Sequence, residues 1–245
     1  GVQIAIFNSV GSRVSTGSSD AAGNYTCFDG LPTGSYFVRS LNLKHYIDEL
    51  HNNIVCTAGV CNETSGTPVA LTVGSQTEVD FALDTGAMIS GRISNKNSGD
   101  ALLGSLIDLY DASGNHLNYE VPDDNGNYST LVGLSTGNYF LKTINQQGLI
   151  DQLYQGIPCV ASRCNPLTGT PIFVQPGNNA QNIDFPLEKG TAIGGQIIES
   201  ATGFPLSDIF VLMFDSAFNL SSFGITNGCG EYESIHGMLS DKYVV

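Results

Sequence analysis

The chain has no tryptophan, few charged side chains and no long apolar run. Charged residues make up 13% of its 245 residues, with 9 Lys and Arg against 23 Asp and Glu. The net charge of −14 argues against binding to nucleic acid or anionic lipid, because the phosphates would be repelled. No apolar run approaches the ~18 residues of a membrane-spanning helix, so no membrane span is predicted.

The chain also lacks an initiator Met, a basic leader and an apolar signal segment. We therefore expect Gly1 to be a cut end. The residue types that favour surface helices are sparse, whereas Gly is abundant at 29 residues. Apolar residues reach 41%, which excludes a disordered tract and indicates a folded chain that is poor in helix.

What is present is an internal repeat. The segment Asp-Ala-Ala-Gly-Asn-Tyr at residues 20–25 returns 103 residues later as Asp-Asp-Asn-Gly-Asn-Tyr at 123–128. After one inserted residue, Val-Asp-Phe-Ala-Leu at 79–83 matches Ile-Asp-Phe-Pro-Leu at 183–187. So many markers in one order make chance a poor explanation of the repeat.

The repeat predicts three segments. Residues 1–85 form a repeat that lacks its first strand, 86–189 form a complete repeat, and 190–245 begin a third. Repeat arrays are commonly long, so we expect a window from a longer array. The alternative is that a neighbouring copy supplies the missing strand, because open sheet edges invite such pairing.

The segments between turn signals are short and typical of β-strands, with Gly and Asn at the turns. About seven strands in ~100 residues predict an all-β fold of tandem Ig-like or prealbumin-like Greek-key β-sandwiches. Residues 41–54 have helical apolar spacing, but their copy at 144–157 contains two Gly residues. A loop or one short turn is therefore expected there.

Several motifs resemble the carboxypeptidase regulatory-like domain family, a prealbumin-like β-sandwich. The motifs are Gly-Gln-Ile at 195–197, Gly-Phe-Pro-Leu at 203–206, the Asp-x-x-Gly-x-Tyr segment at 123–128, Gly-Leu at 133–134 and Gly-Asn-Tyr-Phe at 137–140. The resemblance implies fold more than function, because these are turn glycines and core tyrosines. In that family such domains are commonly non-catalytic stalks or appendages of secreted and surface proteins.

The related collagen-adhesin B-type domains often carry a Lys–Asn isopeptide bond formed with the help of a catalytic Glu. In this chain Lys44 aligns with Gln147, and Lys142 aligns with Arg39. Because the Lys positions do not repeat, that crosslink is not predicted.

Cysteine gives the strongest chemical signal. Cys56 and Cys61 are five residues apart, and Cys159 and Cys164 repeat that spacing 103 residues later. Zinc would need about four ligands, and no His or second Cys pair accompanies either set. A disulfide within each repeat is predicted, which implies an oxidising compartment: the cell exterior, the cell surface or the periplasm.

Cys27 and Cys229 do not repeat, since they align with Thr130 and Asn125. Cys27 lies on a predicted strand, where a buried free thiol is the simplest interpretation. Cys229 lies at a turn tip, where an intermolecular bridge is sterically allowed. The alternative for both is a crosslink between neighbouring repeats or chains.

The remaining candidate residues are weaker signals. The Asp-x-x-Gly-x-Tyr loops offer oxygen ligands but lack the terminal Glu of an EF-type calcium loop, so turn capping by Asp or Asn is predicted. The four His residues do not recur between repeats, and no catalytic, cofactor or metal site is predicted. Four sequons are candidate glycosylation sites, at Asn24, Asn62, Asn127 and Asn219.

Three functions fit these observations. The first is a non-catalytic extracellular stalk, filament or adhesin segment whose partners are neighbouring repeats or copies of itself. The second is a carbohydrate-binding module with glycan partners, for which Tyr119 and Tyr154 are the candidate stacking residues, although the chain lacks the preferred Trp. The third is an accessory domain of a larger secreted enzyme.

Overall fold

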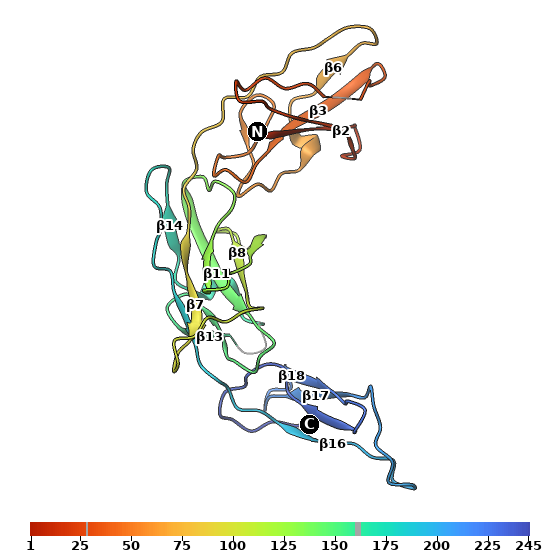
Figure 1. Ribbon diagram of the computed structural model, residues 1–245, viewed down its shortest axis with the longest axis vertical. Helices are drawn as coiled ribbons and strands as arrows, with labels where there is room; N and C mark the ends of the chain where they lie inside the picture. The colour runs from red at the N-terminus through yellow and green to blue at the C-terminus, as the bar shows by residue number, and fades with distance from the viewer. Residues whose placement is uncertain (28, 160–162) are drawn as a thin grey trace. The chain divides into compact units, whose positions relative to one another are not determined.

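The computed structural model describes residues 1–27, 29–159 and 163–245, and it confirms the predicted all-β sandwich fold (Figure 1). The helical segments among these residues are single 3-10 turns, η1 (Glu63–Ser65) and η3 (Pro166–Thr168). No helix of the described residues is long and apolar enough to cross a membrane. The chain divides into two compact units. The repeat boundaries at residues 85 and 189 stay a prediction.

Unit 1 comprises residues 1–89, 130–138 and 173–181. Its main sheet has the strand order β2-β1-β3-β4-β5, with β6 paired to β3. Buried Ile4, Val38 and Val69 form the core beneath this sheet. The strands are β1 (Gln3–Phe7), β2 (Arg13–Ser18), β3 (Gly34–Leu41), β4 (Glu49–Leu50), β5 (Ile54–Val55) and β6 (Val69–Leu71).

Unit 2 comprises residues 90–129, 139–172 and 182–245, and contains a complete pair of packed sheets. One sheet has the order β13-β12-β11-β8-β9, with β14 paired to β11, and the other has the order β10-β7-β15. The Phe185 ring lies 6.3 Å from both the Tyr128 and the Tyr154 ring, between the sheets. The strands are β7 (Ser90–Asn95), β8 (Leu106–Tyr110), β9 (His116–Glu120), β10 (Asn127–Ser129), β11 (Gly137–Ile144), β12 (Asp151–Leu153), β13 (Ile157–Cys159), β14 (Ile172–Val174) and β15 (Phe185–Leu187).

The last part of unit 2 holds two short strand pairs. β16 (Gly194–Gln196) pairs with β19 (Glu231–Glu233), and β17 (Phe210–Phe214) pairs with β18 (Leu220–Ile225). Val211, Met213 and Met238 form a small buried core here. β16 and β17 lie at the sequence positions of β7 and β8 in the preceding segment, so the same strand pattern begins again.

The turns between strands confirm the predicted capping by Asp and Asn side chains. Asp123 Oδ1 accepts the backbone N–H groups of Asn125 and Asn127 at 2.9 and 2.8 Å. The N–H of Asn127, more than any other group, holds the pKa of Asp123 below its usual range. The same two-bond arrangement also closes turns at Asn8, Asp20, Asp111, Asp215 and Asn227.

Candidate functional site

Disulfides, polar side-chain pairs and glycine contacts recur at corresponding positions of the chain. Among the residues that the structure describes, there is no group of three or more His, Cys, Asp or Glu that could hold a metal ion. Three arrangements do recur at the sequence spacing of the repeat. They are a disulfide loop, a buried Asn–Asp pair and a close glycine contact, and together they form the candidate site.

The structure joins Cys56 to Cys61 and Cys159 to Cys164, with Cα–Cα distances of 4.9 and 5.1 Å. Cys56 and Cys159 are both completely buried. Closing so short a loop contributes only about 2 kcal/mol by chain entropy. The disulfides therefore act mainly by fixing a loop in place. Residues 160–162 of the second loop lie outside the described residues.

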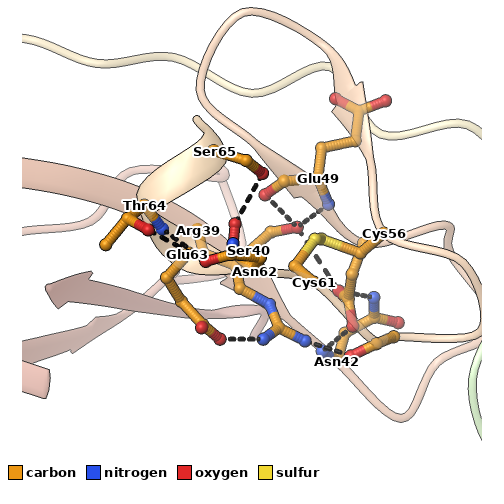
Figure 2. Close-up of a disulfide and its surroundings, with 12 residues drawn as sticks. Arg39, Ser40, Asn42, Glu49, Cys56, Cys61, Asn62, Glu63, Thr64 and Ser65 are labelled. Atoms are coloured by element: carbon orange, nitrogen blue, oxygen red, sulfur yellow. Dashed lines mark hydrogen bonds and ion pairs between the residues drawn. A yellow bond between two sulfur atoms is a disulfide. The ribbon is translucent and has the colours of Figure 1, made fainter. Parts of the chain in front are cut away.

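The first disulfide loop is fastened to the sheet by Arg39 of β3 (Figure 2). Arg39 Nη1 donates to Glu63 Oε1 at 2.6 Å, and Arg39 Nη2 donates to the carbonyl oxygen of Gly59 in the loop. The Arg39 side chain is 9% exposed, so this ion pair lies out of bulk water, where it is screened less than a surface pair. The loop is thereby held in one position against β3.

A buried Asn–Asp pair closes the turn that follows β3. Asn42 Nδ2 donates to Asp48 Oδ1 at 2.6 Å and to the Tyr46 carbonyl at 3.1 Å, while Asn42 Oδ1 accepts the N–H groups of Lys44 and Tyr46. Asp48 is 2% exposed. Burial raises the pKa of Asp48, although hydrogen bonds from Asn42 and the charge of Arg39 oppose the shift.

The same pair recurs 103 residues later. Asn145 Nδ2 donates to Asp151 Oδ1 at 2.6 Å and to the Leu149 carbonyl at 3.1 Å. Asn145 Oδ1 accepts the N–H groups of Gln147 and Leu149. Sequence reasoning missed both pairs. The signal that could have found them is the recurrence of Asn and Asp, six residues apart, inside the repeated segment.

A close glycine contact lies next to the first of these turns, within unit 1. Gly133 donates its N–H to the Tyr46 carbonyl at 3.2 Å, and Gly86 donates to the His45 carbonyl at 2.8 Å. A Cβ atom at Gly133 would lie 2.4 Å from the His45 carbonyl oxygen, and one at Gly86 would lie 2.4 Å from the Gly133 Cα. Only glycine fits at either position. The neighbouring Leu134 is completely buried.

The glycine contact also recurs, within unit 2. Gly237 donates its N–H to the Leu149 carbonyl at 3.2 Å, and Gly190 donates to the Gly148 carbonyl at 3.0 Å. A Cβ atom at Gly190 would lie 2.5 Å from the Gly237 Cα. Met238, the counterpart of Leu134, is 1% exposed. Each contact joins a turn that follows one long strand to a Gly-Leu or Gly-Met segment about 90 residues further along the chain.

One buried carboxylate in this region lacks a partner and yields a prediction. Glu49 is 5% exposed, and its Oε2 has no hydrogen-bond partner. Burial, assisted by the charge of Asp84, raises the pKa of Glu49. Its counterpart 103 residues later is Gln152, whose Nε2 donates to the Pro186 carbonyl. We expect Glu49→Gln to raise the free energy of unfolding at pH 7 by about 1 kcal/mol, because it removes an unpaired buried charge.

The pH dependence of this gain checks its cause. A raised pKa in the folded state means that the wild-type chain loses stability as the pH rises through that pKa. Urea unfolding of the wild type and Glu49→Gln should therefore differ at pH 7 and converge below about pH 4, where Glu is protonated in both states. An equal gain at both pH values would contradict this explanation. Glu78→Gln, at an exposed position of the same unit, is the matched control.

The complete sheet pair has a polar cluster that does not recur. Lys142 is the counterpart of Arg39, and its Nζ lies 3.4 Å from Asp108 Oδ2 and 5.4 Å from the centre of the Tyr110 ring. Burial opposes the charge of Lys142, but Tyr110 and Asp108 outweigh it and raise the pKa of the amine. Asp108 corresponds to Ala5 in the first segment. The cluster thus replaces the Arg39–Glu63 pair in neutralising the basic residue of the strand.

The unpaired cysteines lie apart from these arrangements. Cys27 is half-buried and Cys229 is exposed, and both are free thiols in the structure. Burial raises the pKa of Cys27, which lowers its thiolate fraction. Crosslinking of either residue to another chain stays a prediction.

None of the other predicted residues is completely buried. All four sequon residues are exposed, although Asn62 Oδ1 caps η1 and the Nδ2 groups of Asn127 and Asn219 donate to Asp123 and Asp215. Tyr119 is 54% exposed on β9, whereas Tyr154 is half-buried and packs against Phe185. The two tyrosines therefore differ in their ability to stack on a sugar. The glycosylation of the four Asn residues stays a prediction.

Comparisons with known proteins return structures only. No protein-family model and no curated protein matches the chain. Among solved structures, it is similar to the TIE protein of Bacillus anthracis, with 13% identity over 99% of this chain and 44% of that chain and a TM-score of 0.33. It is also similar to a streptococcal ancillary pilin, with 12% identity over 91% of this chain and 72% of that chain and a TM-score of 0.35.

A third similar structure is a point mutant of the shaft pilin spaA of Lactobacillus rhamnosus GG, with 11% identity over 78% of this chain and 85% of that chain and a TM-score of 0.31. The chain thus spans less than half the length of the Bacillus anthracis protein. All three TM-scores lie below 0.5.

Proposed function

We propose that the chain is a non-catalytic structural segment of an extracellular or surface protein, a stalk or filament built from prealbumin-like β-sandwich repeats. The recurrence of the glycine contact at Gly86–Gly133 and Gly190–Gly237 carries this proposal. This contact leaves no room for a side chain larger than hydrogen, and it is made at two corresponding places in the sequence, which fits a regular array of modules. Its first partners are neighbouring repeats.

Two further observations support an extracellular structural role. The Cys56–Cys61 and Cys159–Cys164 disulfides are stable in oxidising compartments and rare in the cytosol. Arg39 fastens the loop that the first disulfide closes, and the Asn42–Asp48 pair fixes the turn that follows β3. These interactions stiffen the turns, which suits a spacer that has to hold its two ends apart.

Disulfide mapping tests the compartment. We expect mass spectrometry of unreduced peptides from protein secreted in its native host to show the two five-residue loops closed. Electrophoresis with and without reductant then reports on chain-to-chain bridges. Free thiols at all four loop cysteines would contradict the extracellular proposal. Multimers that dissociate on reduction and are absent in Cys229→Ser would show that copies of the chain are joined by disulfides, and the proposal would then include a covalent filament.

The alternative function is carbohydrate binding, either alone or as an accessory domain of a larger secreted enzyme. The exposed ring of Tyr119 favours it, since an exposed aromatic ring can stack on a sugar. A glycan array separates the two functions. If the chain is a stalk, no specific glycan should bind. Glycan binding that is lost in Tyr119→Ala and kept in Tyr154→Ala would favour carbohydrate binding over the stalk function.

A further inference from the structure

The turn between β18 and β19 begins at Asn227, the counterpart of Asp123 in the complete sheet pair. Asn227 Oδ1 accepts the backbone N–H groups of Cys229 and Glu231 at 2.8 and 3.0 Å, in the two-bond arrangement that Asp123 also makes. Gly228 follows Asn227. An Asn-Gly sequence favours attack of the glycine nitrogen on the side-chain amide, because glycine has no Cβ atom to hinder the approach. The turn therefore holds a reactive pair.

The side-chain pair across this turn is reversed relative to its counterpart. Asn227 Nδ2 donates to Glu231 Oε2 at 3.2 Å. In the preceding segment Asn127, the counterpart of Glu231, donates its Nδ2 to Asp123 Oδ2 at 3.3 Å. Each turn thus pairs one amide with one carboxylate, and here the amide belongs to the first residue. An acid at position 227 would place two carboxylates against each other.

The surroundings of the turn match those of its counterpart. Gln196 Nε2 donates to the Cys229 carbonyl at 2.9 Å, just as Arg92 Nε donates to the Asn125 carbonyl at 2.8 Å. The turn is therefore held against β16 in the way that its counterpart is held against β7. Its tip is exposed in both segments.

The backbone nitrogen of Gly228 is free to react. Gly228 is exposed, and a Cβ atom at this position would meet no atom within 4 Å. In the part of the chain that the structure describes, its N–H has no acceptor. The two N–H donors on Asn227 Oδ1 would stabilise the negative charge that develops on this oxygen during attack. Nucleophile and electrophile are thus both available.

The chain has a second Asn-Gly sequence at residues 125–126, but its backbone is locked. Gly126 is buried, and its N–H donates to the Asp123 carbonyl at 2.8 Å. A Cβ atom at Gly126 would lie 2.4 Å from the Ile93 carbonyl oxygen, so β7 packs directly against this glycine. Attack by this nitrogen would require the hydrogen bond to break. The structure thus distinguishes two sites that have the same two residues.

We propose that Asn227 is a site of spontaneous deamidation, with water as the only reactant. The Gly228 nitrogen forms a bond to Asn227 Cγ, the Cγ–Nδ2 bond breaks, and the proton lost by Gly228 leaves on the departing ammonia. Glu231 Oε2, which accepts from Nδ2, can carry that proton. Water then opens the succinimide ring, at Cγ to give Asp or at the main-chain carbonyl to give isoaspartate. Either product carries a new carboxylate beside Glu231, which weakens the turn.

Peptide mass spectrometry after incubation of the full chain in water labelled with heavy oxygen tests the site. Each event is marked, because ring opening adds one oxygen atom from water. At neutral pH we expect Asn227 to acquire the label at least about tenfold faster than Asn125, and the two rates to converge in urea, where the Gly126 hydrogen bond is lost. Equal rates in the folded chain would overturn the inference and leave the structural proposal standing. A difference that persists undiminished in urea would overturn the structural cause.

Gly228→Ala tests the attacking nitrogen. Alanine fits here, because its Cβ atom meets no neighbour and the backbone lies outside the left-handed region. The added methyl group hinders the nitrogen, so labelling at Asn227 should fall about tenfold or more while the midpoint of urea unfolding stays the same. Labelling at Asn125 in the same sample is the control and should not change. An undiminished rate at Asn227 would contradict attack by the Gly228 nitrogen.

Asn227→Asp tests the effect of the modification on the turn. The variant imitates one product, and we expect limited proteolysis within residues 226–232 to become several-fold faster. Adding Glu231→Gln restores one amide and one carboxylate, as in the turn at Asp123, and should return proteolysis to the wild-type rate. If Asn227→Asp were as resistant as the wild type, the predicted weakening of the turn would be wrong.

Discussion

Gly133→Val is expected to destabilise the chain by about 3 kcal/mol or more, because the valine side chain has no space. Its Cβ atom would lie 2.4 Å from the His45 carbonyl oxygen and 2.6 Å from the Tyr46 carbonyl carbon. Both are backbone atoms, which cannot turn aside as the end of a side chain can. The segment must therefore withdraw, and the completely buried Leu134 would become exposed.

Urea unfolding followed by tyrosine fluorescence and far-ultraviolet circular dichroism measures the loss. Limited proteolysis locates it, since detachment should open cleavage near residues 84–88 and 130–135. Gly237→Val is expected to behave in the same way, because a Cβ atom there would lie 2.5 Å from the Gly148 carbonyl oxygen.

The chain provides its own control for this substitution. Gly30 precedes Leu31 as Gly133 precedes Leu134, yet a Cβ atom at Gly30 would meet no atom within 4 Å. Gly30→Val should therefore change the free energy of unfolding by less than about 0.5 kcal/mol. If Gly30→Val and Gly133→Val were equally destabilising, the cause would lie in the turn conformation of the Gly-Leu segment and not in the glycine contact.

The parts of the fold that were predictable depend on neighbours in sequence. The capped turn at Asp123 needs only the N–H groups two and four residues ahead, so the Asp-x-x-Gly pattern predicts it. The Cys56–Cys61 loop is similarly local. Alternation of apolar residues is equally short-range, which is why the all-β fold could be predicted from the residues alone.

The helical spacing of residues 41–54 shows where local patterns fail. Ile47 and Leu50 are buried, but Leu43 is 68% exposed, so these residues share no buried face. Asn42 instead draws the N–H groups of the next residues into a turn, in competition with helix formation. The Asn42 side chain also donates to Asp48, which is buried. That burial depends on the folded sheet and could not be predicted from residues 41–54 alone.

The glycine contacts could not be predicted for a different reason. The Gly-Leu pattern at Gly133 recurs in the sequence, but its partners, His45 and Gly86, lie about 88 and 47 residues earlier in the chain. Nothing in a single sequence identifies such a pair. The repeat does show that Gly86 and Gly190 correspond, and their recurrence is the one clue to a contact that excludes side chains.

Asn42→Ala is expected to lower the free energy of unfolding by about 3 kcal/mol at pH 7. The change removes the donor that lies 2.6 Å from Asp48 Oδ1 and the acceptor of the Lys44 and Tyr46 N–H groups. A carboxylate that is 2% exposed then keeps its charge with fewer donors, which is among the costliest changes a folded chain can undergo. Asn24→Ala, at an exposed position of the same unit, is the control and should change stability by less than about 0.5 kcal/mol.

The pH dependence of the loss identifies Asp48 as its cause. Burial already raises the pKa of Asp48, and hydrogen bonds from Asn42 restrain that rise. Without Asn42 the pKa rises further, so the variant loses more stability than the wild type as the pH increases from about 4 to 7. Urea unfolding at the two pH values should show a deficit smaller by about 1 kcal/mol or more at pH 4. A deficit that is the same at pH 4 and pH 7 would instead assign the loss to the Lys44 and Tyr46 N–H groups. In that case Asn42→Ala should lower the free energy of unfolding equally in the wild type and in Asp48→Asn, whose neutral side chain needs no charge compensation.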